Sequence, residues 1–294
     1  MSPPVAPDIV STLKENKPSM SKADQRLAEL ILSDVDRAVH ASTTELAEWS
    51  GTSTPTVTRF CRKLGFKSLR EFKVHLAQAR AVGERFLTGQ TSSGNHSEAA
   101  EQVVRRAQQA LEIQLGLFDS ERIQTAVSAI QNARRIAVFG CGGGSTIVAQ
   151  DTEHRLFRLG LAVNAYQDSQ MLQMVAATLK KGDVLIAIST SGRVPDLTNA
   201  CEIARHYEAT TVGITRPGSP LSEHIDILLP VDVPEEKQFV NQPTASRYAL
   251  LSVIDVLASE LAVAIGAPAL ENVRRIKHQL VSYRDHEDSQ PLGD

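Results

Sequence analysis

The sequence predicts an all-α helix-turn-helix N-terminal domain and an α/β C-terminal domain with a doubly wound parallel sheet. Residues 1–88 carry apolar side chains at helical spacing and show no strand pattern. After residue 135, short apolar strands alternate with helices, which is the order of a parallel sheet covered on both faces. Between these regions, residues 89–96 are rich in Gly, Ser, Thr and Asn, a composition that predicts a linker. We therefore expect domains at 1–88 and 97–284, with a flexible tail at 285–294.

Composition and cysteine spacing bound the class of protein. Of the 294 residues, 42% are hydrophobic and 22% are charged, which is ordinary for a water-soluble globular protein. We find no apolar run near the ~20 residues that cross a bilayer, and the first residues lack the regions of a signal peptide. Cys61, Cys141 and Cys201 are scattered and form no metal-type spacing. These features predict a cytoplasmic protein with no membrane partner, no metal and no cofactor.

Charge is distributed unevenly along the chain. The net charge of −3 argues by itself against a nucleic-acid binder. However, residues 1–90 hold 13 Lys and Arg against 10 Asp and Glu, and residues 54–80 hold seven basic side chains against one acidic. Such a concentrated basic segment is typical of a surface that contacts DNA phosphates. A solvated helix face would give the same pattern.

The first predicted helices carry clear N-terminal signals. Ser21 precedes apolar residues at helical spacing, and its hydroxyl is expected to cap that helix. Ser42 and Glu45 stand at the spacing of a capping box, which opens a short helix ending at Ser50. Gly51 then supplies a turn.

The helix after this turn carries most of the predicted DNA contacts. Ser53 is the expected cap, Pro55 lies in the first turn, and Gly65 ends the helix. Its buried stripe is expected to comprise Val57, Phe60, Cys61 and Leu64. In a helix-turn-helix, the second helix enters the major groove and its first residues reach base edges. The predicted DNA-contacting residues are Thr44, Thr54, Thr56, Thr58, Arg59, Arg62, Lys63 and Lys67. An ordinary helical bundle would show the same caps and stripe.

A family resemblance extends this interpretation. Residues 54–66 read TPTVTRFCRKLGF and residues 69–73 read LREFK. These stretches closely resemble the N-terminal domain of the RpiR family of bacterial transcription regulators, over about residues 8–85. The resemblance implies that this helix is the recognition helix and that the partner is a double-stranded DNA operator.

The C-terminal region alternates strands with helices. A helix from residue 97 and another at 121–132 precede it. The expected strands are 135–139, 162–165, 184–188, 211–215 and 225–229. The expected helices between and after them are 145–159, 169–179, 194–206, 244–265 and 268–283. Alternation of this kind predicts a doubly wound sheet.

Two loops at strand ends predict a phosphate site. In a doubly wound sheet, ligands bind beyond the carboxyl ends of the strands. Residues 140–145 form a glycine-rich loop, and residues 189–192 place three hydroxyls at a helix start, where backbone N–H groups and the helix dipole favour an anion. Arg193 and Arg247 could neutralise its charge. The same residue types also serve simply as turn and cap residues.

A second resemblance concerns this region. Ile188-Ser189-Thr190-Ser191-Gly192, with the glycine-rich loop before it, resembles the SIS (sugar isomerase) domain over about residues 120–265. SIS domains bind phosphosugars, and the resemblance implies that Ser189, Thr190 and Ser191 hold the phosphate. Ser145 is the candidate serine of the first loop, although many relatives place that serine where this chain has Gly144. The expected ligand-binding residues are Gly142, Gly143, Gly144, Ser145, Ser189, Thr190, Ser191, Gly192, Arg193 and Arg247.

Two other functions compete with phosphosugar sensing. The order Gly140-x-Gly142 begins a dinucleotide fingerprint, but position 145 is Ser; Asp168 would then be the ribose-binding acid of a nicotinamide sensor. A sugar-phosphate isomerase with an accessory helical domain would need a general base. The candidate bases are Glu153, His154, His224, Glu235 and Glu236, and none lies in a motif that marks it as catalytic.

The pattern as a whole favours a regulator over an enzyme. We expect a DNA-binding transcription regulator without catalytic residues, whose operator binding is modulated by a phosphorylated sugar or sugar acid. We also expect a homo-oligomer, either dimer or tetramer, that places two recognition helices on one operator.

Overall fold

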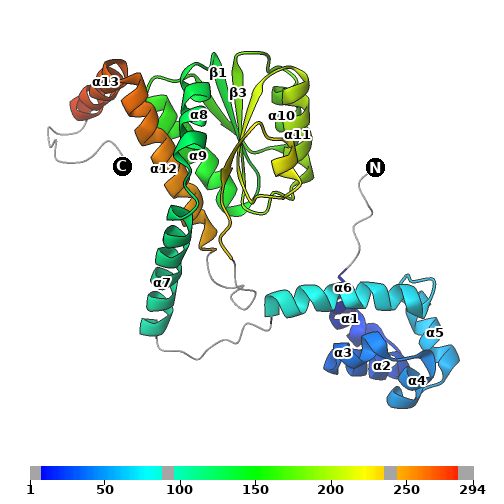
Figure 1. Ribbon diagram of the computed structural model, residues 1–294. Coiled ribbons are helices and arrows are strands. Elements are labelled where there is room, and N and C mark those ends of the chain that lie inside the picture. Colours follow the sequence, from blue (N-terminus) through cyan, green and yellow to red (C-terminus); the bar gives the residue numbers. More distant parts are fainter. Residues whose placement is uncertain (1–7, 88–95, 235–243, 284–294) are drawn as a thin grey trace. The chain divides into compact units, whose positions relative to one another are not determined.

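The computed structural model describes residues 8–87, 96–234 and 244–283 of the chain (Figure 1). The chain divides into two compact units, whose described parts are residues 8–87 and residues 96–234 with 244–283. The predicted linker up to residue 95 and the predicted tail at 285–294 lie outside the described residues.

The N-terminal unit is entirely helical in its described part. Its helices are α1 (Ile9–Asn16), α2 (Lys22–Ser33), α3 (Val35–His40), α4 (Thr43–Ser50), α5 (Thr54–Lys63) and α6 (Leu69–Leu87), with a short 3-10 turn, η1 (Lys17–Ser19). Phe60 of α5 and Phe72 of α6 meet edge to face in the core, and Phe66 packs on Phe72 in the same way. Leu27 of α2 and Leu76 of α6 are fully buried beside them. This core fixes α5 against α2 and α6.

The predicted caps of this unit are confirmed for two helices and wrong for a third. Ser21 accepts the backbone N–H of Asp24, and Ser42 forms a complete capping box with Glu45. Ser53 precedes α5 but caps no backbone N–H, because its hydroxyl pairs instead with Thr56 Oγ1 at 2.9 Å.

The predicted buried stripe of α5 is confirmed except at Leu64, and the predicted turn before α5 is present. Val57, Phe60 and Cys61 are buried as predicted, whereas Leu64, beyond the last residue of α5, is only partly buried. Gly51 ends α4 with a φ of 60°, in the left-handed region that favours glycine.

The C-terminal unit contains the predicted parallel sheet. Its strands are β1 (Arg135–Gly140), β2 (Val163–Tyr166), β3 (Asp183–Ser189), β4 (Thr210–Thr215) and β5 (Ile227–Pro230). Their order is β2-β1-β3-β4-β5, and every neighbouring pair is parallel. In the register of the central strands, Val138 pairs with Ala165 on one side and with Ile186 on the other. The chain places β2 on one side of β1 and β3 on the other side. The strand order therefore switches between β1 and β3, which lie side by side at this point.

Helices cover both faces of this sheet. Alternate residues of β1 divide between two cores: Ile136 and Val138 face one, Ala137 and Phe139 the other. The first core includes residues of α7 (His96–Leu115), α8 (Ser120–Gln131), α9 (Gly143–Arg158) and α12 (Ser246–Ile265). The second includes residues of α10 (Ser169–Ala176), α11 (Pro195–His206) and the 3-10 turn η2 (Leu221–His224). A last helix, α13 (Ala267–Tyr283), contacts α9 and α12.

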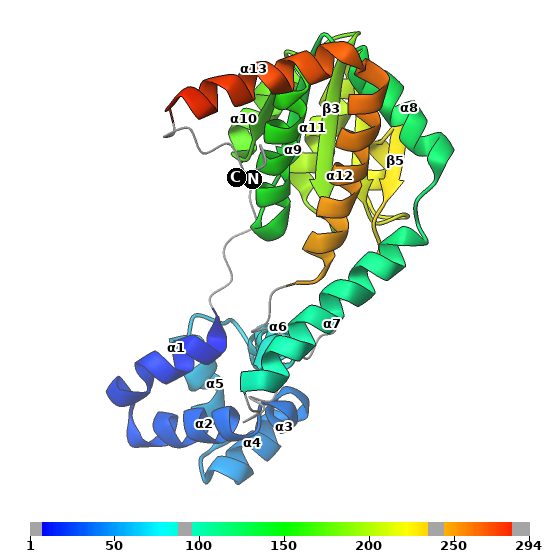
Figure 2. The ribbon, with the colours of Figure 1, turned by 90° about the vertical axis from the view of Figure 1, so that its left-hand side faces the viewer.

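Helix α12 corrects one expectation from the sequence. Among the described residues it is the one helix that is long and apolar enough to cross a bilayer, with a mean hydropathy of 1.9 over its most apolar window. Figure 2 shows it lying across the sheet between α8 and α9. Leu250, Leu257 and Leu261 are buried in that core, and Asp255 pairs with Arg155 of α9 at 3.0 Å. We therefore assign α12 to the core of the C-terminal unit.

Candidate anion-binding site and nucleic-acid interface

The loops that follow β1 and β3 meet at a cavity of about 250 Å³. Because β1 and β3 are neighbours in the sheet, their carboxyl ends bring the two predicted loops together. The start of α12 forms a further wall. The lining residues are Cys141, Gly142, Gly143, Gly144, Ser145, Ser189, Thr190, Ser191, Val194, Thr244, Ser246, Arg247 and Leu250.

The first loop is shaped by glycines that a side chain would disrupt. Gly142 and Gly143 have φ values of 78° and 42° and open α9 two residues earlier than the sequence predicted. A β-carbon on Gly140 would lie 2.3 Å from the carbonyl oxygen of Ser145. The first turn of α9 therefore rests directly on the end of β1, and its N-terminus, the positive end of the helix dipole, lies at the cavity. Ser145 is 7% exposed and still lines the cavity beside Gly144.

The second loop is held by its own hydroxyls. Ser189 Oγ accepts the backbone N–H of Gly192 at 3.1 Å, and Ser191 Oγ accepts that of Arg193 at 3.3 Å. Each of these hydroxyls keeps a hydrogen that it can donate to an anion. Thr190 lines the cavity between them. Gly192 has a φ of 61°, and a β-carbon there would lie 2.1 Å from Ser219 Oγ.

The structure places eight of the ten predicted ligand-binding residues around the cavity. Gly192 shapes the loop without lining the cavity, and Arg193 is exposed outside it. Arg247 lines the cavity, and its Nη2 donates to Tyr248 Oη at 2.9 Å. Sequence reasoning missed Cys141, Val194, Thr244, Ser246 and Leu250. The start of a helix at residues 244–246 was the one available signal for Thr244 and Ser246.

The described residues that the competing functions would use lie outside the cavity lining. Asp168 caps α10 by accepting the N–H of Met171 at 2.9 Å and does not line the cavity. Glu153, His154 and His224 do not line it either. Glu235 and Glu236 lie outside the described residues. In the described part of the chain, no group of three or more His, Cys, Asp or Glu side chains could hold a metal ion.

The three cysteines provide a chemical probe of the cavity. Burial raises the pKa of Cys61 to about 11 and that of Cys201 to about 12, so both thiols are protonated and inaccessible at neutral pH. Cys141 is partly exposed on the cavity wall, although burial and the nearby Asp196 raise its pKa as well.

We expect a thiol reagent such as Ellman's reagent to modify one cysteine of the folded protein, Cys141. Because Cys141 lines the cavity, a high concentration of inorganic phosphate should slow its modification. Absorbance of the released thiolate gives the rate, and the Cys141→Ala variant is the control that should lose the reaction. Modification at an unchanged rate in phosphate would contradict an anion site next to Cys141.

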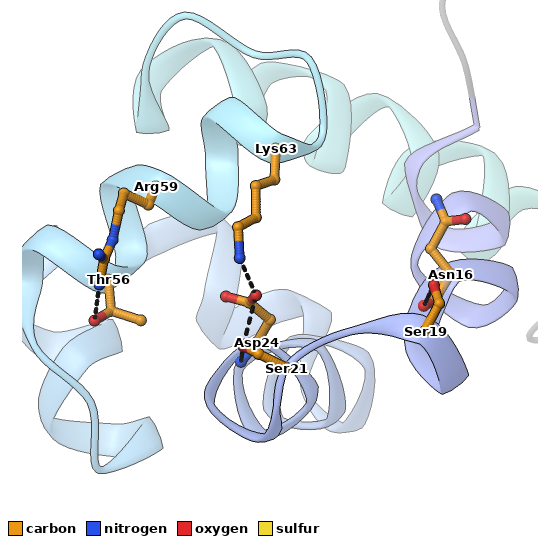
Figure 3. A network of polar contacts seen from close by, with 7 residues as sticks. All are labelled: Asn16, Ser19, Ser21, Asp24, Thr56, Arg59 and Lys63. Atoms are coloured by element: carbon orange, nitrogen blue, oxygen red, sulfur yellow. Dashed lines mark hydrogen bonds and ion pairs between the residues drawn. The ribbon is translucent and has the colours of Figure 1, made fainter.

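Helices α4 and α5, joined at Gly51, form the predicted helix-turn-helix. The side chains of Thr56 and Thr58 are partly exposed. The remaining predicted DNA-contacting residues are exposed, namely Thr44, Thr54, Arg59, Arg62, Lys63 and Lys67. Arg59 donates to Thr56 Oγ1 at 3.4 Å, so the two side chains lie together near the start of α5 (Figure 3). The exposed face of α5 is polar and basic, as a groove-binding helix requires.

Lys63 differs from the other predicted contacts because an acidic partner holds it. Its Nζ atom lies 2.6 Å from Oδ2 of Asp24, a buried residue of α2 (Figure 3). Burial opposes ionisation of Asp24, but hydrogen bonds from Lys63 and Ser21 outweigh it and hold the pKa of Asp24 below its ordinary value.

Comparison with known proteins agrees with both units. Family profiles match the helix-turn-helix domain of the RpiR family at residues 8–83 and the SIS domain at residues 129–260. The HTH-type transcriptional regulator HexR of Pseudomonas aeruginosa is 33% identical over 278 residues, covering 94% of this chain and 97% of its own. HexR of Escherichia coli is 33% identical over 267 residues, covering 90% of this chain and 91% of its own.

A solved structure shares the fold over nearly the whole chain. The Vibrio vulnificus NanR protein, complexed with ManNAc-6P, superimposes with a TM-score of 0.60 at 24% identity, covering 94% of this chain and 98% of NanR. Two matched domains in the same order, and two full-length relatives above 30% identity, are sufficient to assign the family. The chain belongs to the RpiR family of HTH-type transcriptional regulators, with a C-terminal SIS domain.

Proposed function

We propose that a phosphorylated sugar or sugar acid binds in the cavity at the ends of β1 and β3 and changes the affinity of α5 for operator DNA. The observation that carries this proposal is the convergence of Ser145, Ser189, Thr190 and Ser191 with the starts of α9 and α12 in one cavity. Hydroxyls and helix N-termini are the groups that proteins use to bind phosphate. The complex of the related NanR with ManNAc-6P supports a phosphosugar as the ligand class.

The cavity suggests how the ligand is divided between its walls. We infer that residues 189–192 and the start of α9 hold the phosphate, because they offer hydroxyls and backbone N–H groups without a charged side chain. Arg247 and Ser246 lie on the wall formed by α12. We assign the sugar hydroxyls or a sugar carboxylate to that wall, since a guanidinium pairs well with a carboxylate.

A thermal-shift screen tests the ligand class. Phosphorylated sugars and sugar acids should raise the melting temperature of the protein, because a ligand that binds only the folded state stabilises it. Unphosphorylated sugars and NADH form the comparison arms. A shift with NADH alone would favour a nicotinamide sensor, and a shift with unphosphorylated sugars would contradict the assignment of the phosphate loop.

DNA binding is assigned to the exposed face of α5. We infer that Thr54, Thr56 and Arg59 reach base edges, since they lie in the first turn and a half of the helix. We assign phosphate contacts to Arg62 and Lys67, which follow that stretch, to Thr44 on α4, and to Thr58 within it. Two copies of the chain in a homo-oligomer would place two such helices on one operator.

Replacing Arg59 by Ala should weaken binding to the operator by about 10- to 100-fold, because a good base-edge contact contributes about 1–3 kcal/mol. Binding to DNA of random sequence should change far less. Fluorescence anisotropy on an operator duplex and a random duplex measures both. An unchanged preference for the operator would show that Arg59 does not read bases.

Coupling between the two sites requires a ligand that distinguishes two arrangements of the readers. Only differential affinity of the phosphosugar for those arrangements can shift the population that binds DNA. We further infer a regulator without catalytic activity, since none of the described candidate bases lines the cavity. We also infer that this regulator works in the cytoplasm, where its DNA operator would lie. Turnover of aldose phosphates by the purified protein would instead favour an isomerase.

A further inference from the structure

A buried carboxylate lies beneath the proposed recognition helix and holds one of its lysines. Asp24 belongs to α2 and stands 39 residues before Lys63 in the sequence. The Asp24 side chain is 5% exposed, whereas that of Lys63 is 61% exposed. Figure 3 shows Lys63 pointing from α5 toward Asp24, while Arg59 points toward Thr56 on its own helix. Arg59 and Lys63 therefore have different surroundings on the same helix.

The position of Asp24 is fixed by a second partner. Ser21 Oγ donates to Asp24 Oδ2 at 2.7 Å and accepts the Asp24 backbone N–H at 3.3 Å. The carboxylate is thus fixed on the first turn of α2. Its charge is balanced chiefly by the ammonium of Lys63, and loss of that ammonium would leave the buried charge with only the longer-range attraction of Arg59.

This pairing opposes any contact between Lys63 and DNA. To reach a phosphate, the Lys63 ammonium would have to leave the buried Asp24 carboxylate. Its attraction to that carboxylate is stronger than its attraction to a phosphate surrounded by water. Arg62 and Lys67 face no such competition: within residues 8–87, no ion pair or side-chain hydrogen bond engages their charged groups. We therefore separate Lys63 from the cations that contact phosphates.

We propose that Asp24 is a positioning residue, which withholds Lys63 from the DNA phosphates and so limits the sequence-independent affinity of α5 for DNA. The inference rests on the proposed DNA-binding role of α5. Each phosphate contact adds affinity for every DNA sequence alike. Withholding one contact therefore lowers the affinity for every DNA sequence by the same factor and leaves sequence recognition to the residues that reach base edges.

Salt dependence of binding tests this proposal directly. The full-length protein is titrated, at several salt concentrations, against a duplex of random sequence and a duplex enriched from a random library by selection on the wild type. Asp24→Asn removes the charge at constant shape and releases Lys63. We expect the slope of log K against log [salt] to steepen by about 0.9 for each recognition helix bound. Affinity for the two duplexes should rise by a similar factor.

The reverse substitution gives the complementary result. Lys63→Met should leave the slope unchanged, because Lys63 contributes no phosphate contact in the wild type. Lys67→Met should make the slope shallower by about 0.9 for each recognition helix bound and shows that the assay resolves a single contact per helix. A shallower slope for Lys63→Met would overturn the proposal, as would an unchanged or shallower slope for a folded Asp24→Asn variant.

Two further variants separate positioning from net charge and from folding. Glu15→Gln removes one negative charge from an exposed position on α1 and should leave the slope unchanged. The double variant Asp24→Asn with Lys63→Met should return the slope to the wild-type value. Melting temperature and circular dichroism verify folding, and if one of the two single variants does not fold, the other decides. Absence of salt-dependent binding by the wild type would contradict the proposed function itself.

Discussion

Replacing Gly140 by Ala should disrupt the anion site and destabilise the C-terminal unit. The new β-carbon would lie 2.3 Å from the carbonyl oxygen of Ser145 and 2.8 Å from the β-carbon of Ala149. Neither neighbour is the end of a flexible side chain, so the first turn of α9 must move away from β1. We expect the free energy of unfolding to fall by about 3 kcal/mol and the stabilisation by phosphosugar to be lost.

Chemical denaturation followed by circular dichroism measures the first effect, and thermal shift with the ligand measures the second. Gly116→Ala is the matched control, because a β-carbon there would make an ordinary contact of 3.5 Å with the carbonyl oxygen of Ile113. That variant should unfold with nearly wild-type stability and bind the ligand normally. Wild-type stability of Gly140→Ala would mean that α9 is not seated on β1 as described.

Replacing Ser189 and Ser191 together by Ala should abolish the ligand response and spare DNA binding. Both hydroxyls belong to the loop that lines the cavity. A hydrogen bond to a charged group contributes about 1.5–3 kcal/mol. Loss of two such donors should weaken phosphosugar binding by at least about 100-fold. Ser189 also loses its bond to the N–H of Gly192, which loosens the loop and adds to the effect.

Isothermal titration calorimetry with the phosphosugar that gives the largest thermal shift measures the loss. Operator affinity without ligand should equal that of the wild type, because the substitutions lie in the other unit. Ser252→Ala is the control: its hydroxyl donates to the carbonyl of Ala249 within α12, away from the cavity lining. Full ligand affinity in the double variant would place the phosphate elsewhere.

Features encoded within a few residues were predicted well. The caps at Ser21 and Ser42 depend on the next three residues alone, and both are present. The predicted cap at Ser53 is wrong because the hydroxyl of Thr56, three residues later, pairs with the Ser53 hydroxyl, which then bonds no backbone N–H. The alternation of apolar strands with helices likewise predicted the parallel sheet, and its topology brought the loops after β1 and β3 together.

Features that depend on distant residues were not predictable in the same way. Thr244, Ser246 and Leu250 reach the cavity only because α12 packs across the sheet, more than fifty residues after Ser191 in the sequence. The spacing of charges around Lys63 showed a basic helix but not its acidic partner on α2. The sequence shows which residues are charged, but only the tertiary fold shows which of them lie close enough to form an ion pair.

The cavity is built from two parts of the chain that can change independently. The loops after β1 and β3 are tied to the central strands, where Gly140 and Gly192 leave no room for substitution. The wall contributed by residues 244–250 belongs to the start of a helix and carries different side chains. On the proposed division of the ligand, exchanging residues there should change which metabolite binds and leave phosphate binding intact. This wall is therefore the place to begin when building biosensors from this scaffold.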